Sequence, residues 1–287
     1  MTQGNYTQFK AHALELDTLR HRAPSVFASG PMQGVSGRYT FVPTARIVEG
    51  LRDLNWVPVE VEEQRIRQEQ RRGFQKHLIR FRLSAQLAAL DEWNIELVLV
   101  NSHDAGCAYQ LHAGIYRRIC SNGLVVGEGE FEALRFRHSG LDPGTVVNAS
   151  LRLLEEMPRL SGRIQRFRDR ILEPVEARAF ARHALRLRYP TEAEAPVSPE
   201  ALLLSRRIED EGPDLWRVLN KVQEGLIRGG VCDGHRDARG RMRSVRALRG
   251  IDSRVNLNKE LWSLAERFTS GSVLENTSSP PPLIVNN

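Results

Sequence analysis

Lysine and cysteine are both scarce in this sequence of 287 residues. Only four of its 41 basic residues are lysines, so 37 are arginines. The three cysteines, Cys107, Cys120 and Cys232, are odd in number and lack the paired short spacings of a disulfide framework. We therefore expect reduced thiols and a cytoplasmic protein.

Long apolar runs are also absent. No stretch approaches 18 uncharged apolar residues, so we expect no transmembrane helix. The first ten residues are polar, which predicts no secretory signal peptide. The glycine-rich segment Gly127-Glu128-Gly129 lacks the Lys-Ser/Thr pair of a phosphate-binding loop, so the sequence supports no nucleotide site.

The charge of the chain is positive. The formal net charge is +6 and the isoelectric point is about 9.6, which favours a polyanionic partner. Guanidinium groups pair with phosphates through two hydrogen bonds and stack on bases, so an arginine excess suits nucleic acid. A GC-rich genome also encodes arginine in place of lysine, but the net positive charge is the same under either explanation.

Residues 36–147 read as one helix followed by a run of strands. Pro43-Thr44 can begin a helix with Thr44 as its N-cap. Residues 62–73 are highly charged and read as the long polar tip of a hairpin. Apolar and polar residues alternate, or short apolar runs occur, in segments 56–61, 74–83, 95–100, 109–119, 124–126 and 131–136. This pattern predicts a mostly antiparallel meander sheet.

From residue 148 onward apolar residues recur at helical spacing, with an interruption at Glu173-Pro174. A further helix is expected to end at Gly229-Gly230, and a last one to cover 257–268. The predicted fold class is α+β, with a helical C-terminal part. The predicted divisions are a flexible N-terminal segment 1–35, a sheet domain 36–147, a helical region 148–269 and a disordered tail 270–287.

The densest polar cluster is Asn101-Ser102-His103-Asp104, directly after a buried strand candidate, with Asn122 in a later turn. A Ser/His/Asp catalytic set would need three side chains to converge, which neighbours on one strand end do poorly. A zinc site from His103, Cys107, His112 and Cys120 lacks the short Cys-x₂-Cys spacing. We favour a turn-and-cap set that bonds backbone amides, with direct ligand contact as a further alternative. No catalytic residue, metal ligand or cofactor is therefore assigned.

A basic hairpin is the second candidate site. The predicted phosphate-binding residues share a positive charge and lie on two neighbouring strand candidates or the tip between them: Arg71, Arg72, Lys76, Arg80 and Arg82. Arg80 and Arg82 should share one face because side chains alternate along a strand. Phe74 could stack on bases. The alternative is a solvated edge whose arginines are neutralised by nearby glutamates such as Glu60, Glu62, Glu63 and Glu69.

Two more segments carry basic residues. Tyr116 could stack on a base, and Arg117 and Arg118 point to opposite faces of their strand. Residues 228–254 contain eight arginines and five glycines, a composition that can follow a phosphate backbone or form an ordinary surface loop.

Several blocks of residues resemble a family of bacterial proteins from prophages, plasmids and other mobile elements, known only as a domain of unknown function. The resemblance covers roughly residues 36–268. The blocks are Ser36-Gly37-Arg38-Tyr39, Gly73-Phe74-Gln75-Lys76-His77, Asn101-Ser102-His103-Asp104, Cys120-Ser121-Asn122-Gly123 and Leu215-Trp216-Arg217-Val218-Leu219-Asn220. One departure is Ala105, where the family pattern has glycine. The resemblance implies a mobile-element setting and no particular activity.

The order of elements is similar to that of Rad52-type single-strand annealing proteins, in which a helix precedes a long hairpin and further strands. This likeness implies rings of subunits that bind single strands in a basic groove. We therefore predict a single-stranded DNA-binding, strand-annealing protein of phage or plasmid recombination. It would be a homo-oligomer, such as a ring of subunits. It would bind DNA in preference to RNA, contact no membrane and need no cofactor. The alternatives are a metal-dependent nuclease that uses His103 and Asp104, or a protein that acts on host defence by protein contact.

Overall fold

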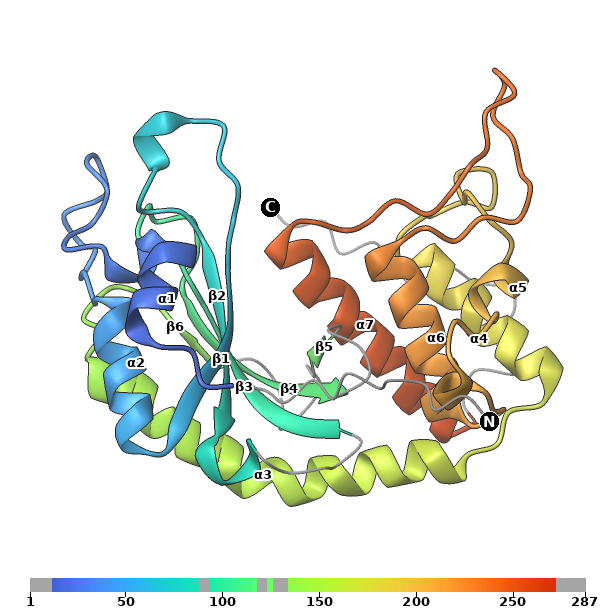
Figure 1. The fold of residues 1–287 in the computed structure, drawn as a ribbon, viewed down its shortest axis with the longest axis horizontal. Helices are drawn as coiled ribbons and strands as arrows, with labels where there is room; N and C mark the ends of the chain where they lie inside the picture. Colours follow the sequence, from blue (N-terminus) through green and yellow to red (C-terminus); the bar gives the residue numbers. More distant parts are fainter. Residues whose placement is uncertain (1–11, 88–92, 118–122, 126–133, 272–287) are drawn as a thin grey trace, which may run out of the picture. The chain divides into compact units, whose positions relative to one another are not determined.

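The computed structural model describes residues 12–87, 93–117, 123–125 and 134–271. The chain forms two compact units, coloured by sequence in Figure 1. The N-terminal unit comprises residues 1–160 and 248–259, and the C-terminal unit comprises 161–247 and 260–287. None of the helices in the described ranges is long and apolar enough to cross a membrane.

The N-terminal unit is built on one antiparallel sheet, which confirms the predicted α+β class. Its strand order is β1-β2-β3-β4-β5, and β6 pairs with the same strand β4 as β5 does. The strands are β1 (Trp56–Glu63), β2 (His77–Leu83), β3 (Trp93–Asn101), β4 (Tyr109–Arg117), β5 (Gly123–Val125) and β6 (Leu134–Phe136). Consecutive strands pair from β1 to β5, as the alternating sequence pattern predicted.

One face of the sheet is covered by α2 (Thr44–Asp53). Ile47, Val48 and Leu51 recur at helical spacing and are fully buried, as are Ile79 and Phe81 of β2. Figure 1 shows α1 (Leu16–Arg22) beside α2 on this side of the sheet. Burying this apolar stripe fixes the helix on the sheet, because each side chain removed from water contributes about 1.5–3 kcal/mol.

The first 35 residues were expected to be flexible. The structure instead places α1 and a short 3-10 helix, Pro24–Phe27, within the described part of this segment. Leu19 and Val26 have no exposed surface, so both short elements belong to the core of the N-terminal unit. The expected disordered tail covers 270–287, of which 272–287 lie outside the described residues.

The opposite face of the sheet meets the beginning of α7 (Ile251–Thr269). Ile251 and Val255 form one apolar cluster with Val98, Val100 and other buried sheet residues. The sequence pattern placed the start of this helix at Leu257. The true start at Ile251 was missed because charged residues separate the two apolar ones that face the sheet.

The C-terminal unit is helical. Its core includes Phe167 against Trp262, with ring centroids 4.8 Å apart, and Phe180 against Phe268 at 5.1 Å. The predicted break at Glu173-Pro174 is confirmed, because Glu173 is the N-cap of the next helix. The elements of this unit are the later part of α3 (Pro143–Asp169), α4 (Pro174–Arg186), α5 (Pro199–Leu202), the 3-10 helix Ile208–Asp210, α6 (Leu215–Arg228) and the later part of α7.

Candidate nucleic-acid interface

Arg80 and Arg82 share one face of β2, as the period of a strand requires. Both guanidinium groups bind the same carboxylate: Arg80 Nε donates to Glu96 at 2.7 Å and Arg82 Nη2 donates to it at 2.5 Å. The Glu96 side chain has no exposed surface, and those of Arg80 and Arg82 are 13% and 7% exposed. The two arginines are therefore mostly buried in ion pairs that stabilise the sheet.

Tyr116 completes this buried cluster. The Arg80 guanidinium lies 3.4 Å from the centre of the Tyr116 ring, an arrangement of cation and aromatic face that is itself favourable. Burial alone would lower the pKa of Arg80, but the Glu96 carboxylate raises it on balance. Tyr116 is 6% exposed, so its ring faces a guanidinium where the sequence analysis expected a nucleic-acid base.

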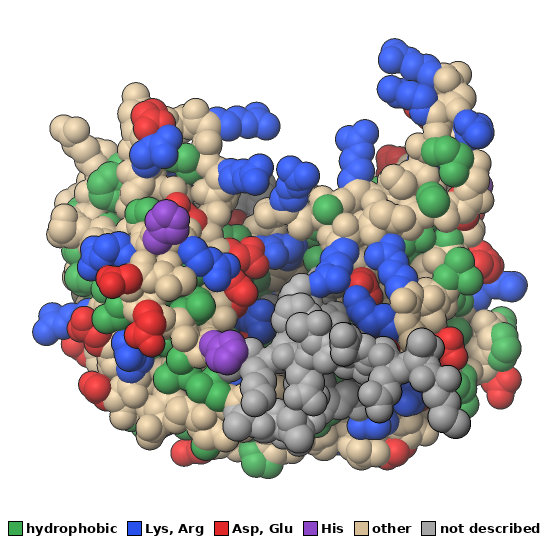
Figure 2. Space-filling model, viewed as in Figure 1, with side chains coloured by type: hydrophobic (Ala, Val, Ile, Leu, Met, Phe, Trp, Pro, Cys, Tyr) green, Lys and Arg blue, Asp and Glu red, His purple; other side chains and the backbone are tan. Residues whose placement is uncertain are grey.

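The connection between β1 and β2 holds the other predicted phosphate ligands. Arg71 pairs with Asp104 at 2.6 Å, while Arg72 pairs with Glu69 and Lys76 with Asp252. Figure 2 shows Asp and Glu side chains interspersed with Lys and Arg over this unit. These ion pairs neutralise most of the charge that the sequence analysis assigned to the hairpin.

The structure describes the remaining predicted nucleic-acid-binding residues only in part. Phe74 is half-buried beside the loop that carries His103, whose amide donates to the Phe74 carbonyl at 2.8 Å. Arg117 is the last residue of β4, and its side chain is not described. Arg118 and Asn122 lie outside the described residues.

The asparagine-serine-histidine-aspartate block lies at the end of β3, inside a buried polar network centred on Thr44. The Thr44 hydroxyl is 3.0 Å from His77 Nε2, 3.1 Å from His103 Nε2, 3.1 Å from the Tyr109 hydroxyl and 3.0 Å from Asn101 Nδ2. A hydroxyl supplies one donor and two acceptor positions, so these four groups share three hydrogen-bonding positions. The network therefore has alternative hydrogen-bond arrangements.

Thr44 was expected to cap its helix. The helix instead begins at Thr44 with Pro43 in the N-cap position, and the Thr44 hydroxyl is occupied by the network. Sequence reasoning also missed His77 and His138 as network members. His77 is the register partner of Asn101, so pairing the two predicted strands in register would have brought these residues together.

The network histidines are held neutral. Burial lowers the pKa of His77 to about 3, and burial together with the His138 ring lowers that of His103 to about 4. His103 Nδ1 is buried and makes no hydrogen bond with any described residue. At neutral pH these rings therefore serve as uncharged hydrogen-bonding groups.

Ser102, His103 and Asp104 face three different partners. The Ser102 hydroxyl contacts the amide of Cys107 at 3.1 Å, His103 contacts Thr44, and Asp104 pairs with Arg71. Such an arrangement does not form a catalytic triad, which requires the three groups to bond in series. Within the described ranges no three His, Cys, Asp or Glu side chains are placed to share a metal ion.

A second basic hairpin lies in the C-terminal unit, within the arginine-rich segment that the sequence analysis singled out. We define it as residues 235–243. Arg236 and Met242 form an antiparallel bridge, and the Arg243 amide donates to the His235 carbonyl at 2.7 Å. The turn includes Gly240, whose φ of +73° favours glycine. The sequence predicted a flexible basic segment, and the structure shows a closed hairpin.

The carboxylate of Asp237 is used inside this turn. It accepts hydrogen bonds from the amides of Arg239 and Arg241 at 2.9 Å each, and pairs with the Arg241 side chain at 2.8 Å. These contacts lower the pKa of Asp237. Arg236 and Arg239 are exposed, and neither forms an ion pair with a described residue. In Figure 2 basic side chains project from the loop that Figure 1 colours orange.

The base of the hairpin is fixed to the end of α6. The predicted helix stop is confirmed at Gly229, whose φ is +71° and whose added Cβ would lie 2.5 Å from the Val245 carbonyl. The Gly230 amide donates to that carbonyl at 2.7 Å, and Arg206 donates to the Gly229 carbonyl at 2.8 Å. These contacts hold both arms of the segment together where it leaves the helix.

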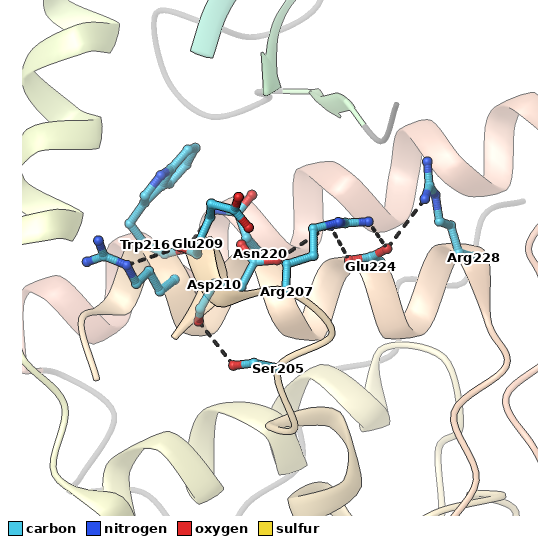
Figure 3. Close-up of polar contacts among 9 residues, drawn as sticks. Ser205, Arg207, Glu209, Asp210, Trp216, Asn220, Glu224 and Arg228 are labelled. Atoms are coloured by element: carbon cyan, nitrogen blue, oxygen red, sulfur yellow. Dashed lines mark hydrogen bonds and ion pairs between the residues drawn. The ribbon is translucent and has the colours of Figure 1, made fainter. Parts of the chain in front are cut away.

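An ion-pair chain along α6 supports this junction (Figure 3). Arg207 donates two hydrogen bonds to Glu224, at 2.6 and 2.8 Å, and lies 3.4 Å from Asp210. Arg228 reaches Glu224 at 3.5 Å. Bidentate pairs of this kind fix geometry as well as charge. Arginines at the junction are therefore paired with carboxylates, in contrast to Arg236 and Arg239 in the hairpin.

Comparison with known proteins identifies a family and no activity. Residues 31–262 match the family described as a domain of unknown function, DUF932. Two Escherichia coli proteins, UPF0380 protein YfjQ and UPF0380 protein YafZ, are each 35% identical over 243 residues, covering 85% of this chain and 87% of the relative. No solved structure matches the chain, so the likeness to Rad52-type proteins stays a prediction.

Proposed function

The chain belongs to the DUF932 family, whose description states no activity, and we propose that it binds single-stranded DNA through the arginine hairpin 235–243. The observation that carries this proposal is the excess of cations on one short element. Residues 236–243 contain four arginines and one acidic residue, Asp237, which is already occupied within the turn. Such an element attracts a phosphate backbone.

The shape of the hairpin suits a strand whose bases are accessible. Arg236, Arg239 and Arg241 are exposed, and guanidinium planes can stack on bases as well as pair with phosphates. Met242 lies among them with 50% of its surface exposed, which offers an apolar contact to an unpaired base. A duplex hides its base faces, so these contacts favour a single strand.

The proposal keeps DNA as the partner, because the mobile-element setting expected for the family favours DNA over RNA. It also retains strand annealing and assembly into a homo-oligomer as part of the same hypothesis. Particle images of the purified protein with and without single-stranded DNA test the assembly, and an oligomer that forms or lengthens on DNA is the expected result.

The nuclease alternative receives less support from the geometry. His103 has no exposed surface and contacts Thr44, while Asp104 is held by Arg71 and by the amide of Gly106. Neither side chain is placed to activate water in front of a strand. For action on host defence by protein contact, no observation on the described residues provides specific support.

Fluorescence anisotropy with a labelled oligothymidylate tests the proposal. The informative change is Arg239→Glu, because Arg239 lies in the exposed turn and its side chain makes no ion pair with a described residue. Replacing a cation by an anion at a phosphate contact should weaken binding by about tenfold or more at moderate salt.

The matched control is Arg166→Glu, which makes the same charge change at an exposed position of α3 in the same unit. This control should leave binding close to that of the unmodified protein. Equal losses in both variants would show that only net charge matters and would contradict the hairpin. Equal affinity for a duplex of the same length would contradict the single-strand preference.

A further inference from the structure

A cavity of about 440 Å³ lies between α4, the segment that follows it and the arginine hairpin, all within the C-terminal unit. We call it the α4 pocket. Ligand sites usually have volumes of 300–1,000 Å³, so its size suits a small organic molecule. Its lining includes Arg182, Leu185, Arg186, Tyr189, Val197 and Arg243.

Part of the lining is apolar. Leu185 and Val197 are each 4% exposed and belong to the buried core, and the half-buried Tyr189 adds an aromatic ring. A ring with one face accessible can stack on a planar ligand group. The pocket therefore has a surface for a flat, uncharged part of a ligand.

Three guanidinium groups contribute the charge. Arg182 and Arg186 are one turn apart on α4, and Arg243 comes from the hairpin. Arg182 is exposed and forms no ion pair with a described residue. Arg243 donates from one terminal nitrogen to the carbonyls of Ala193 and Glu194, at 3.2 and 2.8 Å, so these two contacts occupy a single nitrogen of its fork.

The carboxylates of the lining compensate this charge only in part. Glu200 pairs with Arg178 at 2.7 Å, an arginine outside the lining. Glu192 lies 3.8 Å from Arg186, at the long end of an ion pair, and 78% of its side chain is exposed. An anionic group entering the pocket would therefore meet more positive than negative charge.

The hairpin side of the pocket is held in place by Asp233. Its carboxylate accepts hydrogen bonds from the Ser198 amide at 2.6 Å and from His235 Nδ1 at 2.5 Å. Burial would raise the pKa of Asp233, but these hydrogen bonds lower it well below its usual range. The second of these hydrogen bonds fixes the His235 ring at the edge of the pocket.

We propose that the α4 pocket binds a nucleotide through a terminal phosphate monoester. Arg182, Arg186 and Arg243 would hold the phosphate, and Tyr189 with Leu185 would contact the base. A monoester carries nearly two negative charges at neutral pH and a diester only one, so a site with three guanidinium groups prefers a terminal phosphate. The ligand can be a free nucleoside monophosphate or the phosphorylated end of a strand.

Titration calorimetry of the full chain with thymidine monophosphate, and with thymidine as the uncharged comparison, tests the site. The monophosphate should bind and thymidine should bind at least about tenfold more weakly, the loss expected for a charge-assisted contact. Arg182→Glu should weaken monophosphate binding by about tenfold or more, whereas Arg166→Glu should leave it unchanged. Tyr189→Ala is a second variant and should weaken binding without removing the preference for phosphate.

A pair of oligothymidylates, with and without a 5′ phosphate, shows whether the ligand is a free nucleoside monophosphate or the phosphorylated end of a strand. Tighter binding of the phosphorylated strand that Arg182→Glu removes assigns the site to strand ends. Monophosphate binding with no effect of the strand phosphate assigns it to free nucleotides. If neither the monophosphate nor the strand phosphate binds in an Arg182-dependent way, the proposal is overturned. Failure of this proposal can be distinguished from failure of DNA binding by the arginine hairpin, because the hairpin is tested with the unphosphorylated strand and Arg239→Glu.

Discussion

Glu96 on β3 and Arg82 on β2 lie 2.5 Å apart between Oε1 and Nη2, and the Glu96 side chain has no contact with solvent. Arg80 binds the other oxygen of the same carboxylate. One buried anion therefore holds two cations that sequence reasoning had assigned to a nucleic-acid surface. Arg80 and Arg82 therefore stabilise the fold, in contrast to the exposed arginines of the hairpin, which are available to a partner.

Removing the shared carboxylate should be costly. Glu96→Ala leaves two mostly buried guanidinium groups without their anion, and we expect it to lower the free energy of unfolding by about 3–5 kcal/mol. Chemical denaturation monitored by circular dichroism measures this change. Glu69→Ala, which removes an exposed ion pair with Arg72, is the control and should leave stability nearly unchanged. Similar stability of the two variants would contradict a structural role for Glu96.

The hydroxyl of Thr44 should matter more than its methyl group. Thr44→Val keeps the shape but removes the hydrogen-bonding partner of His77 and Asn101, and each buried group left unsatisfied costs about 1–3 kcal/mol. Thr44→Ser retains the hydroxyl and should lose less. Thermal unfolding of both variants gives the comparison, and a serine variant as unstable as the valine variant would argue against the network.

Acid should destabilise the protein before its carboxylates titrate. The folded-state pKa values of His77 and His112 are lowered to about 3 and that of His103 to about 4, mainly by burial. The unfolded chain takes up protons near pH 6.5, so stability is complete above that pH and falls as pH decreases toward 4. Each histidine contributes a slope of about 1.4 kcal/mol per pH unit.

His112 allows a direct check of this slope. Both of its ring nitrogens are buried without a hydrogen bond to a described residue, so His112→Leu removes a titrating group and breaks no hydrogen bond with the described residues. We expect the variant to be as stable as the parent at pH 7 and less sensitive to acid. An unchanged slope in His112→Leu would contradict the assignment.

The loop after β3 contains a strained residue. Ala105 has a φ of +59°, the left-handed region that costs an L-residue about 1 kcal/mol, and it stands where the family pattern has glycine. Ala105→Gly should therefore raise the free energy of unfolding by about 1 kcal/mol. Ala108→Gly in the same loop, where φ is not positive, should be neutral or destabilising. The reverse order of the two variants would contradict this account of the turn.

The sheet could be predicted from sequence because its strands are alternating or short apolar segments that follow one another along the chain. The buried ion pairs of Arg80 and Arg82 could not be predicted from sequence, because they depend on the strand register that places Glu96 beside them. Their sharing of one face follows from local geometry, while their pairing follows from tertiary contacts. The α4 pocket was likewise beyond sequence reasoning, since Arg182 and Arg243 are far apart in the chain and meet only in the fold.

The salt dependence of binding to oligothymidylate tests the central claim most directly. If the hairpin arginines contact phosphates, the logarithm of the binding constant should fall linearly with the logarithm of salt concentration. Each phosphate neutralised contributes about 0.7 to that slope for a single strand. Arg239→Ala should reduce the slope by about 0.7 and Arg166→Ala should not change it. A slope near zero, or one that Arg239→Ala leaves intact, would contradict binding of DNA by this hairpin.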